Sequence, residues 1–164
     1  LQTHKTIGKV VELEKLGAAN PLAGNSGIAH TRWATHGEPS SINSHPHNSS
    51  GISIVHNGII ENHEQLRSEL TEAGYKFVSA TDSEVIAHLI HQQLQTESNL
   101  RTAVEKTIAK LEGAYSLGVI SKDQPDVLIG TRSGSPLVIG VGIDENFIAS
   151  DQMALRQVTD RLFF

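Results

Sequence analysis

The 164-residue sequence lacks cysteine altogether. This absence removes disulfide frameworks, thiolate zinc sites and cysteine nucleophiles from the chemistry that these residues can perform. The sequence also lacks any run of Lys or Arg, because its 13 basic residues are spread along the chain among 18 acidic ones. A nucleic-acid surface or a basic membrane-binding helix is therefore not expected. No apolar run approaches the roughly 18 residues that a membrane span needs, so we expect neither nucleic acid nor membrane as a partner.

The length fits about one domain, and a chain of this size can bury about 70% of its unfolded surface without a metal or disulfide. It begins at Leu1, with neither an initiator Met nor the pattern of a signal peptide, and it ends in the apolar run 162–164. We therefore expect residues 1–164 to be a partial domain of a cytoplasmic protein, cut at both ends.

The spacing of apolar residues predicts helices in the middle of the chain and short strands on either side. Thr81 and Glu84 have the spacing of a capping box, which would start one of these helices. Closely spaced strands with short polar turns favour antiparallel pairing, so we expect an α+β fold rather than alternating α/β. Helices are expected over 9–16, 61–73, 82–94 and 98–111, and strands over 27–31, 52–56, 115–120, 127–130, 137–141 and 147–149.

Nine histidines are more than average, and His45-Pro46-His47 lies near others in sequence. Clustered imidazoles suggest zinc, but no His-Glu-x-x-His pair or similar helical spacing is present. Two histidines flanking a proline in a loop more often hydrogen-bond to the backbone. We therefore expect no metal and no cofactor, while an α+β metal-binding protein built on His45 and His47 remains an alternative.

Segment 31–37 places an Arg, a Trp, two hydroxyls and a His at the end of an expected strand. The fork of the Arg32 guanidinium suits a carboxylate, because two parallel N–H groups meet two oxygens. The alternative is a structural ion pair from Arg32 to a Glu, with a half-buried Trp33.

Asn57-Gly58 and Asp82 are similarly open to two interpretations. Asn-Gly after an alternating strand is a strong hairpin signal, but an Asn amide beside a Gly N–H also supplies two donors to an oxyanion. Asp82 fits a helix start, where acids are favoured, or the partner of an ammonium group. Together with Arg32, these groups describe a site for an α-amino acid undergoing acyl transfer.

Seven segments in order carry a family resemblance that covers nearly the whole chain. They are TRWATHGEP (31–39), NSHPH (43–47), HNGIIEN (56–62), TDSEVIAH (81–88), LEGAYS (111–116), RSGSPLVIG (132–140) and NFIASD (146–151). The chain resembles the glutaminase domain of the glutamine:fructose-6-phosphate aminotransferases, or glucosamine-6-phosphate synthases. The resemblance implies an N-terminal-nucleophile hydrolase fold, a four-layer α/β/β/α sandwich of antiparallel sheets that is here incomplete at both ends.

The resemblance also implies roles for individual residues and partners. L-glutamine is the implied substrate, and the implied acceptor unit is a pair of sugar isomerase domains, absent here, in a homo-oligomeric parent protein that binds fructose-6-phosphate. Asn57 and Gly58 resemble the oxyanion hole, and Trp33 resembles the residue that gates ammonia passage. The residues that resemble glutamine ligands are Arg32 for the α-carboxylate, Thr35 and His36 in the same pocket, and Asp82 for the α-ammonium group.

In enzymes of this family, a cysteine at the mature N-terminus attacks the glutamine side-chain amide, and its own α-amino group acts as the base. Only thirty residues precede Thr31 here, and none is cysteine. We therefore expect this chain alone not to hydrolyse glutamine, and we expect exposed sheet edges to cause poor solubility or association.

Two further alternatives remain. The chain could be the glutaminase domain of another amidotransferase, of the amidophosphoribosyltransferase or asparagine synthetase type, although segments 33–37 and 132–136 fit the aminotransferases better. It could also be a non-catalytic module that binds glutamine.

Overall fold

The structure, a computed structural model, describes residues 1–33 and 36–164. Its larger sheet is antiparallel and has the strand order β1-β2-β3-β4. Strand β2 and strand β3 form its centre, paired along their full lengths from Ile52↔Ser121 to Ile60↔Gly113. The bounds are β1 His47–Ser49, β2 Ile52–Ile60, β3 Gly113–Ser121 and β4 Gln124–Ser133.

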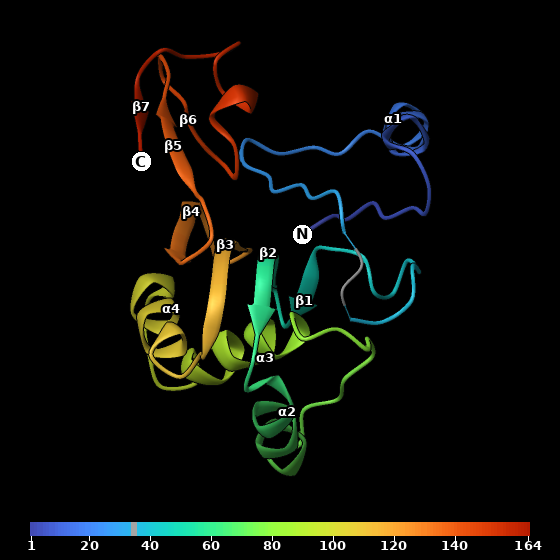
Figure 1. The fold of residues 1–164 in the computed structure, drawn as a ribbon, viewed down its shortest axis with the longest axis vertical. Coiled ribbons are helices and arrows are strands. Elements are labelled where there is room, and N and C mark those ends of the chain that lie inside the picture. The colour runs from blue at the N-terminus through green and yellow to red at the C-terminus, as the bar shows by residue number, and fades with distance from the viewer. Residues whose placement is uncertain (34–35) are drawn as a thin grey trace.

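Three helices cover one face of this sheet (Figure 1). They are α2 His63–Glu72, α3 Glu84–Gln93 and α4 Leu100–Ile108. The helix α3 is buried from Glu84 to Ile90 because it packs against α2, α4 and the strands β1 and β2. The hydrophobic core lies between the helices and the sheet and consists of Ile52, Ile54, Ile60, Leu66, Leu70, Val85, Ile86, Ala87, Leu89, Ile90, Leu100, Ala103, Val104, Tyr115, Leu117 and Val119.

A second, smaller sheet has the order β6-β5-β7 and lies above the first in Figure 1. Its strands are β5 Val138–Val141, β6 Asn146–Ala149 and β7 Leu162–Phe163. Ile148 of β6 packs over glycines of the larger sheet, since a Cβ at Gly118 or Gly130 would lie 3.3 Å from its side chain. The described elements thus give a helix layer, a sheet and a second sheet, and the α+β prediction agrees with them.

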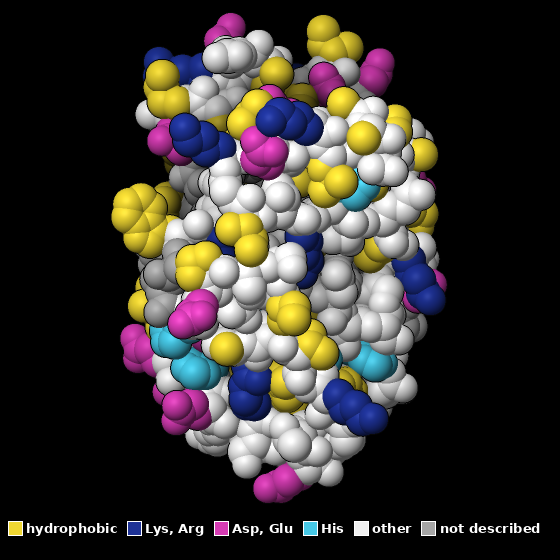
Figure 2. Space-filling model, turned by 90° about the vertical axis from the view of Figure 1, so that its right-hand side faces the viewer, with side chains coloured by type: hydrophobic (Ala, Val, Ile, Leu, Met, Phe, Trp, Pro, Cys, Tyr) yellow, Lys and Arg dark blue, Asp and Glu magenta, His cyan; other side chains and the backbone are white. Residues whose placement is uncertain are grey.

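The remaining helical elements are peripheral. Helix α1, Val10–Ala19, contains no buried residue, and its Val10 and Val11 are exposed. A short 3-10 turn, η1 Gln152–Ala154, precedes Leu155, which packs against Gly140 of β5. No helix in the described ranges is long and apolar enough to cross a membrane. On the face in Figure 2, acidic and basic side chains are interspersed.

Several sequence predictions need correction. The strand expected to end at Asn57-Gly58 continues to Ile60, because both residues pair with β3 instead of forming a turn. Residues 27–31 form no strand, since no described strand pairs with them. The capping box is also wrong: α3 starts at Glu84, whose carboxylate binds the N–H groups of Val78 and Ser79.

Candidate active site

A cavity of about 340 Å³ lies where the loop before residue 34 meets β2 and the segment leading into α3. It brings together five of the seven residues that the sequence assigned to a site: Arg32, Trp33, Asn57, Gly58 and Asp82. The other lining residues are His30, Thr31, His45, His56, Ile59, Thr81 and Ser83. Residues up to 53 positions apart in sequence therefore converge on one cavity.

The other two predicted residues are placed differently. Thr35 lies outside the described residues. His36 is described, and its ring lies edge-on to that of His63 at a centroid distance of 5.1 Å. Its carbonyl oxygen accepts a hydrogen bond from Arg32, but His36 is not among the described residues that line the cavity.

Arg32 shapes its own loop. Its Nη2 donates hydrogen bonds to the carbonyl oxygens of His36 and Gly37, the latter at 2.9 Å. Over residues 1–33 and 36–164, no carboxylate lies within ion-pair distance of its guanidinium, so the predicted structural ion pair is not found. Nη1 also donates to the carbonyl oxygen of Glu38 at 3.5 Å, so two of the five N–H donors of the guanidinium remain for a carboxylate in the cavity.

Trp33 is one of the residues that line the cavity. Its side chain is 90% exposed, so the alternative of a half-buried structural Trp is wrong. Trp33 therefore both lines the cavity and faces solvent.

Gly58 occupies a position that no other residue fits. Its φ is +125°, and a Cβ there would lie only 2.0 Å from the carbonyl oxygen of Ala114 in β3. The neighbouring Asn57 points its Oδ1 at His30, whose Nε2 is 2.7 Å away. The strand pairing of β2 with β3 therefore fixes both residues of the proposed pair of oxyanion donors.

Asp82 is buried, with 3% of its surface exposed. Its Oδ2 accepts a hydrogen bond from the backbone N–H of Ile60 at 2.9 Å, and Ser83 Oγ lies 3.4 Å from its Oδ1. The carboxylate thus joins the end of β2 to the residues before α3. Helix α3 begins two residues later, so Asp82 also lies next to a helix N-terminus, as the helix-start interpretation requires.

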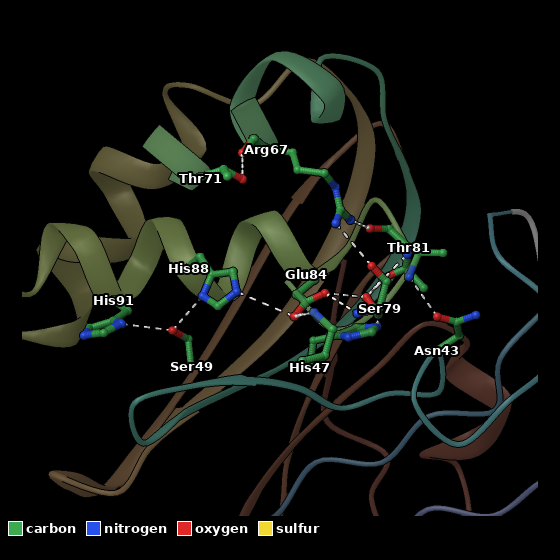
Figure 3. A network of polar contacts seen from close by, with 12 residues as sticks. Asn43, His47, Ser49, Arg67, Thr71, Ser79, Thr81, Glu84, His88 and His91 are labelled. Atoms are coloured by element: carbon green, nitrogen blue, oxygen red, sulfur yellow. Dashed lines mark hydrogen bonds and ion pairs between the residues drawn. The ribbon is translucent and has the colours of Figure 1, made fainter. Parts of the chain in front are cut away.

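Glu84 holds the segment before Asp82 in place through hydrogen bonds (Figure 3). The Glu84 carboxylate accepts hydrogen bonds from the N–H groups of Val78 and Ser79 at 3.0 and 2.8 Å, and from Ser79 Oγ at 2.6 Å. Burial alone would raise the pKa of Glu84, but contacts with His88 and these donors outweigh it and lower the pKa to about 2. Glu84 therefore stays ionised and keeps the segment in place.

Two further side chains hold the same segment from its flanks (Figure 3). The Arg67 guanidinium donates to the carbonyl oxygens of Ser79 and Thr81 at 3.2 and 2.7 Å. Asn43 accepts a hydrogen bond from the N–H of Ala80 at 2.9 Å. Asp82 is consequently positioned by a network rather than by its own contacts alone.

Histidines form one wall of the cavity, which the sequence indicated only as a cluster without a geometry. The ring of His45 lies 4.0 Å from that of His30 and 6.4 Å from that of His56, centroid to centroid. Burial lowers the pKa of each of these three, that of His56 to about 4 even though Asp82 opposes the shift. The imidazoles are therefore neutral at pH 7. In the part of the chain that the structure describes, no three His, Cys, Asp or Glu side chains are grouped so that they could hold a metal ion.

A second polar constellation lies at the interface of β1 and α3 (Figure 3). Ser49 Oγ is 2.9 Å from Nδ1 of His88, and Nε2 of His88 is 3.6 Å from Glu84. The chain of contacts Ser49–His88–Glu84 resembles a hydrolytic triad. However, Ser49 Oγ also contacts His91 Nδ1 at 2.9 Å, and the side chains of Ser49, His88 and Glu84 are all buried. A substrate cannot reach a buried hydroxyl, so we interpret the constellation as structural.

Comparison with known proteins points to one enzyme class. A family model described as "Glutamine amidotransferase domain" matches residues 30–157. The chain is 59% identical over 165 residues to the glutamine--fructose-6-phosphate aminotransferase [isomerizing] of Pseudomonas putida, and 57% identical over 160 residues to that of Escherichia coli K12. These matches cover 100% and 98% of the chain but 27% and 26% of the two relatives, so the chain spans about a quarter of their length.

Solved structures give the same result for the fold. The glutamine phosphoribosylpyrophosphate amidotransferase from B. subtilis has a TM-score of 0.64 at 27% identity, covering 77% of this chain and 28% of that one. A second structure, the allosteric regulatory enzyme of purine biosynthesis, has a TM-score of 0.60 at 26% identity and covers 71% of this chain and 26% of that one. The predicted fold of the N-terminal-nucleophile type is thereby confirmed.

Proposed function

Because the chain belongs to the glutamine amidotransferase domain family, we propose that its cavity binds L-glutamine as part of the glutaminase unit of a glutamine:fructose-6-phosphate aminotransferase. The observation that carries the proposal is the convergence of Arg32, Asp82 and Asn57-Gly58 on one cavity. A guanidinium, a carboxylate and a pair of amide donors together match the two charged groups and the reacting amide of glutamine.

Each group has one task in the proposed complex. Arg32 binds the α-carboxylate with guanidinium donors that its loop contacts leave free. Asp82 uses Oδ2 for the Ile60 N–H, and Oδ1, which has only the 3.4 Å contact with Ser83 Oγ, binds the α-ammonium group. Asn57 Nδ2 and the Gly58 N–H stabilise the oxyanion that forms when the side-chain amide is attacked, a contribution typically of about 3 kcal/mol per donor.

Trp33 covers the bound glutamine and directs the released ammonia away from water. Its ring lines the cavity and faces solvent, which suits both tasks. We further propose that the ammonia reaches a sugar isomerase unit that holds fructose-6-phosphate, the sugar phosphate in the names of the P. putida and E. coli relatives. The product would be glucosamine-6-phosphate, a precursor of amino sugars.

The attacking thiol of the family is not among these 164 residues. We therefore propose that catalysis needs a nucleophile from outside this segment. The test is a chimera in which this chain replaces the matched segment of the P. putida enzyme. Release of glutamate from L-glutamine above the rate of the same chimera with its N-terminal Cys replaced by Ala would support the proposal, and the absence of release from a folded chimera would contradict it.

The second candidate is a module that binds glutamine without catalysis, favoured by the absence of cysteine. The same chimera separates the two. A chimera that binds glutamine but releases no glutamate would favour the binding module. Synthesis of glucosamine-6-phosphate, rather than glutamate release alone, would further support the aminotransferase over the amidophosphoribosyltransferase type.

A further inference from the structure

The side chain of His30, two residues before Arg32 in the chain, contacts the side chain of Asn57. Its Nε2 is 2.7 Å from Asn57 Oδ1, which is a short side-chain hydrogen bond between residues 27 positions apart. Both residues line the candidate cavity. Resting on the proposed glutaminase function, we propose that His30 is a positioning residue that turns the Asn57 amide so that its NH₂ group, and not its carbonyl oxygen, faces the reacting substrate.

The direction of the hydrogen bond follows from the chemistry of the two groups. An amide oxygen can only accept, so His30 must donate from Nε2. The Asn57 NH₂ group is then on the side of the amide away from His30. Over the described residues, Nδ2 has no hydrogen-bond partner and is not shut off from solvent, so it is free to donate to an oxyanion. If the amide were turned over, its oxygen would repel that oxyanion.

The surroundings of His30 hold it in the state that this task needs. Burial lowers its pKa, and hydrogen bonding to the Asn57 side chain and to the His56 backbone only partly opposes the shift. The ring is therefore neutral at pH 7 and carries one N–H. Nε2 lies 2.7 Å from the Asn57 oxygen, whereas Nδ1 is buried and meets no hydrogen-bond criterion among the described residues. This geometry favours a proton on Nε2. The backbone of His56 is the competing partner for the ring, and the NMR test below decides between the two. The ring of His45, 4.0 Å away, packs against it and limits its rotation.

The kinetic test uses the active chimera and three substitutions. His30→Leu removes the donor and should lower kcat for glutamate release about tenfold or more, with KM changed less than about threefold, because the oxyanion exists only in the transition state. His30→Gln places an N–H near the same point and should recover most of kcat. His91→Leu is the matched control, since His91 likewise makes a side-chain hydrogen bond, with Ser49 Oγ, but does not line the cavity, and it should leave kcat unchanged.

A double variant distinguishes an effect of His30 through Asn57 from an unspecific loss of activity. Asn57→Ala should lower kcat about 10²- to 10³-fold, and adding His30→Leu to it should lower kcat no further, because His30 acts through Asn57. Multiplicative losses would overturn the proposal. An equal loss of kcat in His30→Gln and His30→Leu would also overturn it.

A spectroscopic test needs no catalysis and no substitution. Long-range ¹H–¹⁵N NMR spectra of the 164-residue chain at pH 7 should show His30 as the Nε2–H tautomer. A predominant Nδ1–H tautomer would overturn the proposal even if the variants failed to fold. If the unsubstituted chimera releases no glutamate, the proposed function fails; if it is active and His30→Leu matches it, only the role of His30 fails.

Discussion

The cavity joins two regions that are built in different ways. The framework, β1–β4 with α2–α4, contains nearly every buried apolar side chain, among them Ile54, Ile60 and Val85 at 0% exposure. The arm, residues 1–46, contains no buried apolar side chain in its described part; only Asn43 and His45 are buried there. The framework supplies Asn57, Gly58 and Asp82, and the arm supplies Arg32 and Trp33.

This difference separates stability from binding. Framework site residues are fixed by sheet pairing and burial, so changing them should disturb the fold as well as the site. Arm site residues are fixed by hydrogen bonds within their own loop, so changing them should affect the site alone. The following predictions test this separation, from the largest effect to the smallest.

Gly58→Ala should have the largest effect. The added Cβ would lie 2.0 Å from the Ala114 oxygen at a φ of +125°, so β2 and β3 must separate. We expect a loss of more than about 4 kcal/mol in the free energy of unfolding, or no folded protein. Gly74→Ala is the control, because its φ is +92° but no atom lies within 4 Å; it should cost only about 1–2 kcal/mol in urea unfolding. Equal effects at both positions would contradict the account.

Acid should destabilise the protein below pH 6.5. His47 and His56 have an ordinary pKa of 6.5 but about 4 in the folded protein, chiefly through burial. Between these values the unfolded chain binds more protons than the folded one. The free energy of unfolding is therefore undiminished by these histidines above pH 6.5 and falls as the pH drops towards 4. Each imidazole should contribute a loss of up to about 3 kcal/mol.

Urea unfolding midpoints at pH 7.5, 6.5, 5.5 and 4.5 measure this loss. His47→Gln keeps a donor near Thr81 Oγ1, which His47 Nε2 contacts at 3.1 Å, and it should make the pH dependence shallower. An unchanged slope in His47→Gln would rule out His47 as a source. Glu84 should add a further loss only between its ordinary pKa of 4.5 and its folded value of about 2.

Two substitutions of Asp82 should separate its contribution to stability from its contribution to glutamine binding. Asp82→Ala leaves the buried Ile60 N–H without its acceptor and should cost about 1–3 kcal/mol of stability. Asp82→Asn retains an acceptor oxygen and should cost less than about 1 kcal/mol, yet it should weaken glutamine binding at least tenfold because the charge opposite the ammonium group is lost. Thermal unfolding and calorimetry on the same samples would show whether stability and binding separate in this way.

Arg32→Ala should have the smallest effect on stability. Its hydrogen bonds go to carbonyl oxygens of an exposed loop, where water can replace them, so we expect a change of less than about 1 kcal/mol. A loss comparable to that of Asp82→Ala would show that the arm is part of the cooperative unit, contrary to the distinction between the two regions.

The sequence predicted the framework well because its helices and strands bury regular apolar faces. It failed at 27–31, where the apolar residues suggest a strand but pairing depends on a partner distant in sequence. Local rules also misassigned Asn57-Gly58 as a strand end, since only the closeness of β3 reveals why glycine is needed there. No sequence pattern predicts the contact of His30 with Asn57, because it joins a residue of the arm to a framework residue 27 positions later in the chain.

The central claim is that the cavity between arm and framework is a site for L-glutamine. Isothermal titration of L-glutamine into the 164-residue chain tests it most directly, with Arg32→Ala and Asp82→Asn as folded variants and D-glutamine as a stereochemical control. We predict saturable binding of one L-glutamine per chain, at least tenfold weaker in both variants and absent for D-glutamine. Undetectable binding, or binding that neither substitution weakens, would contradict the account.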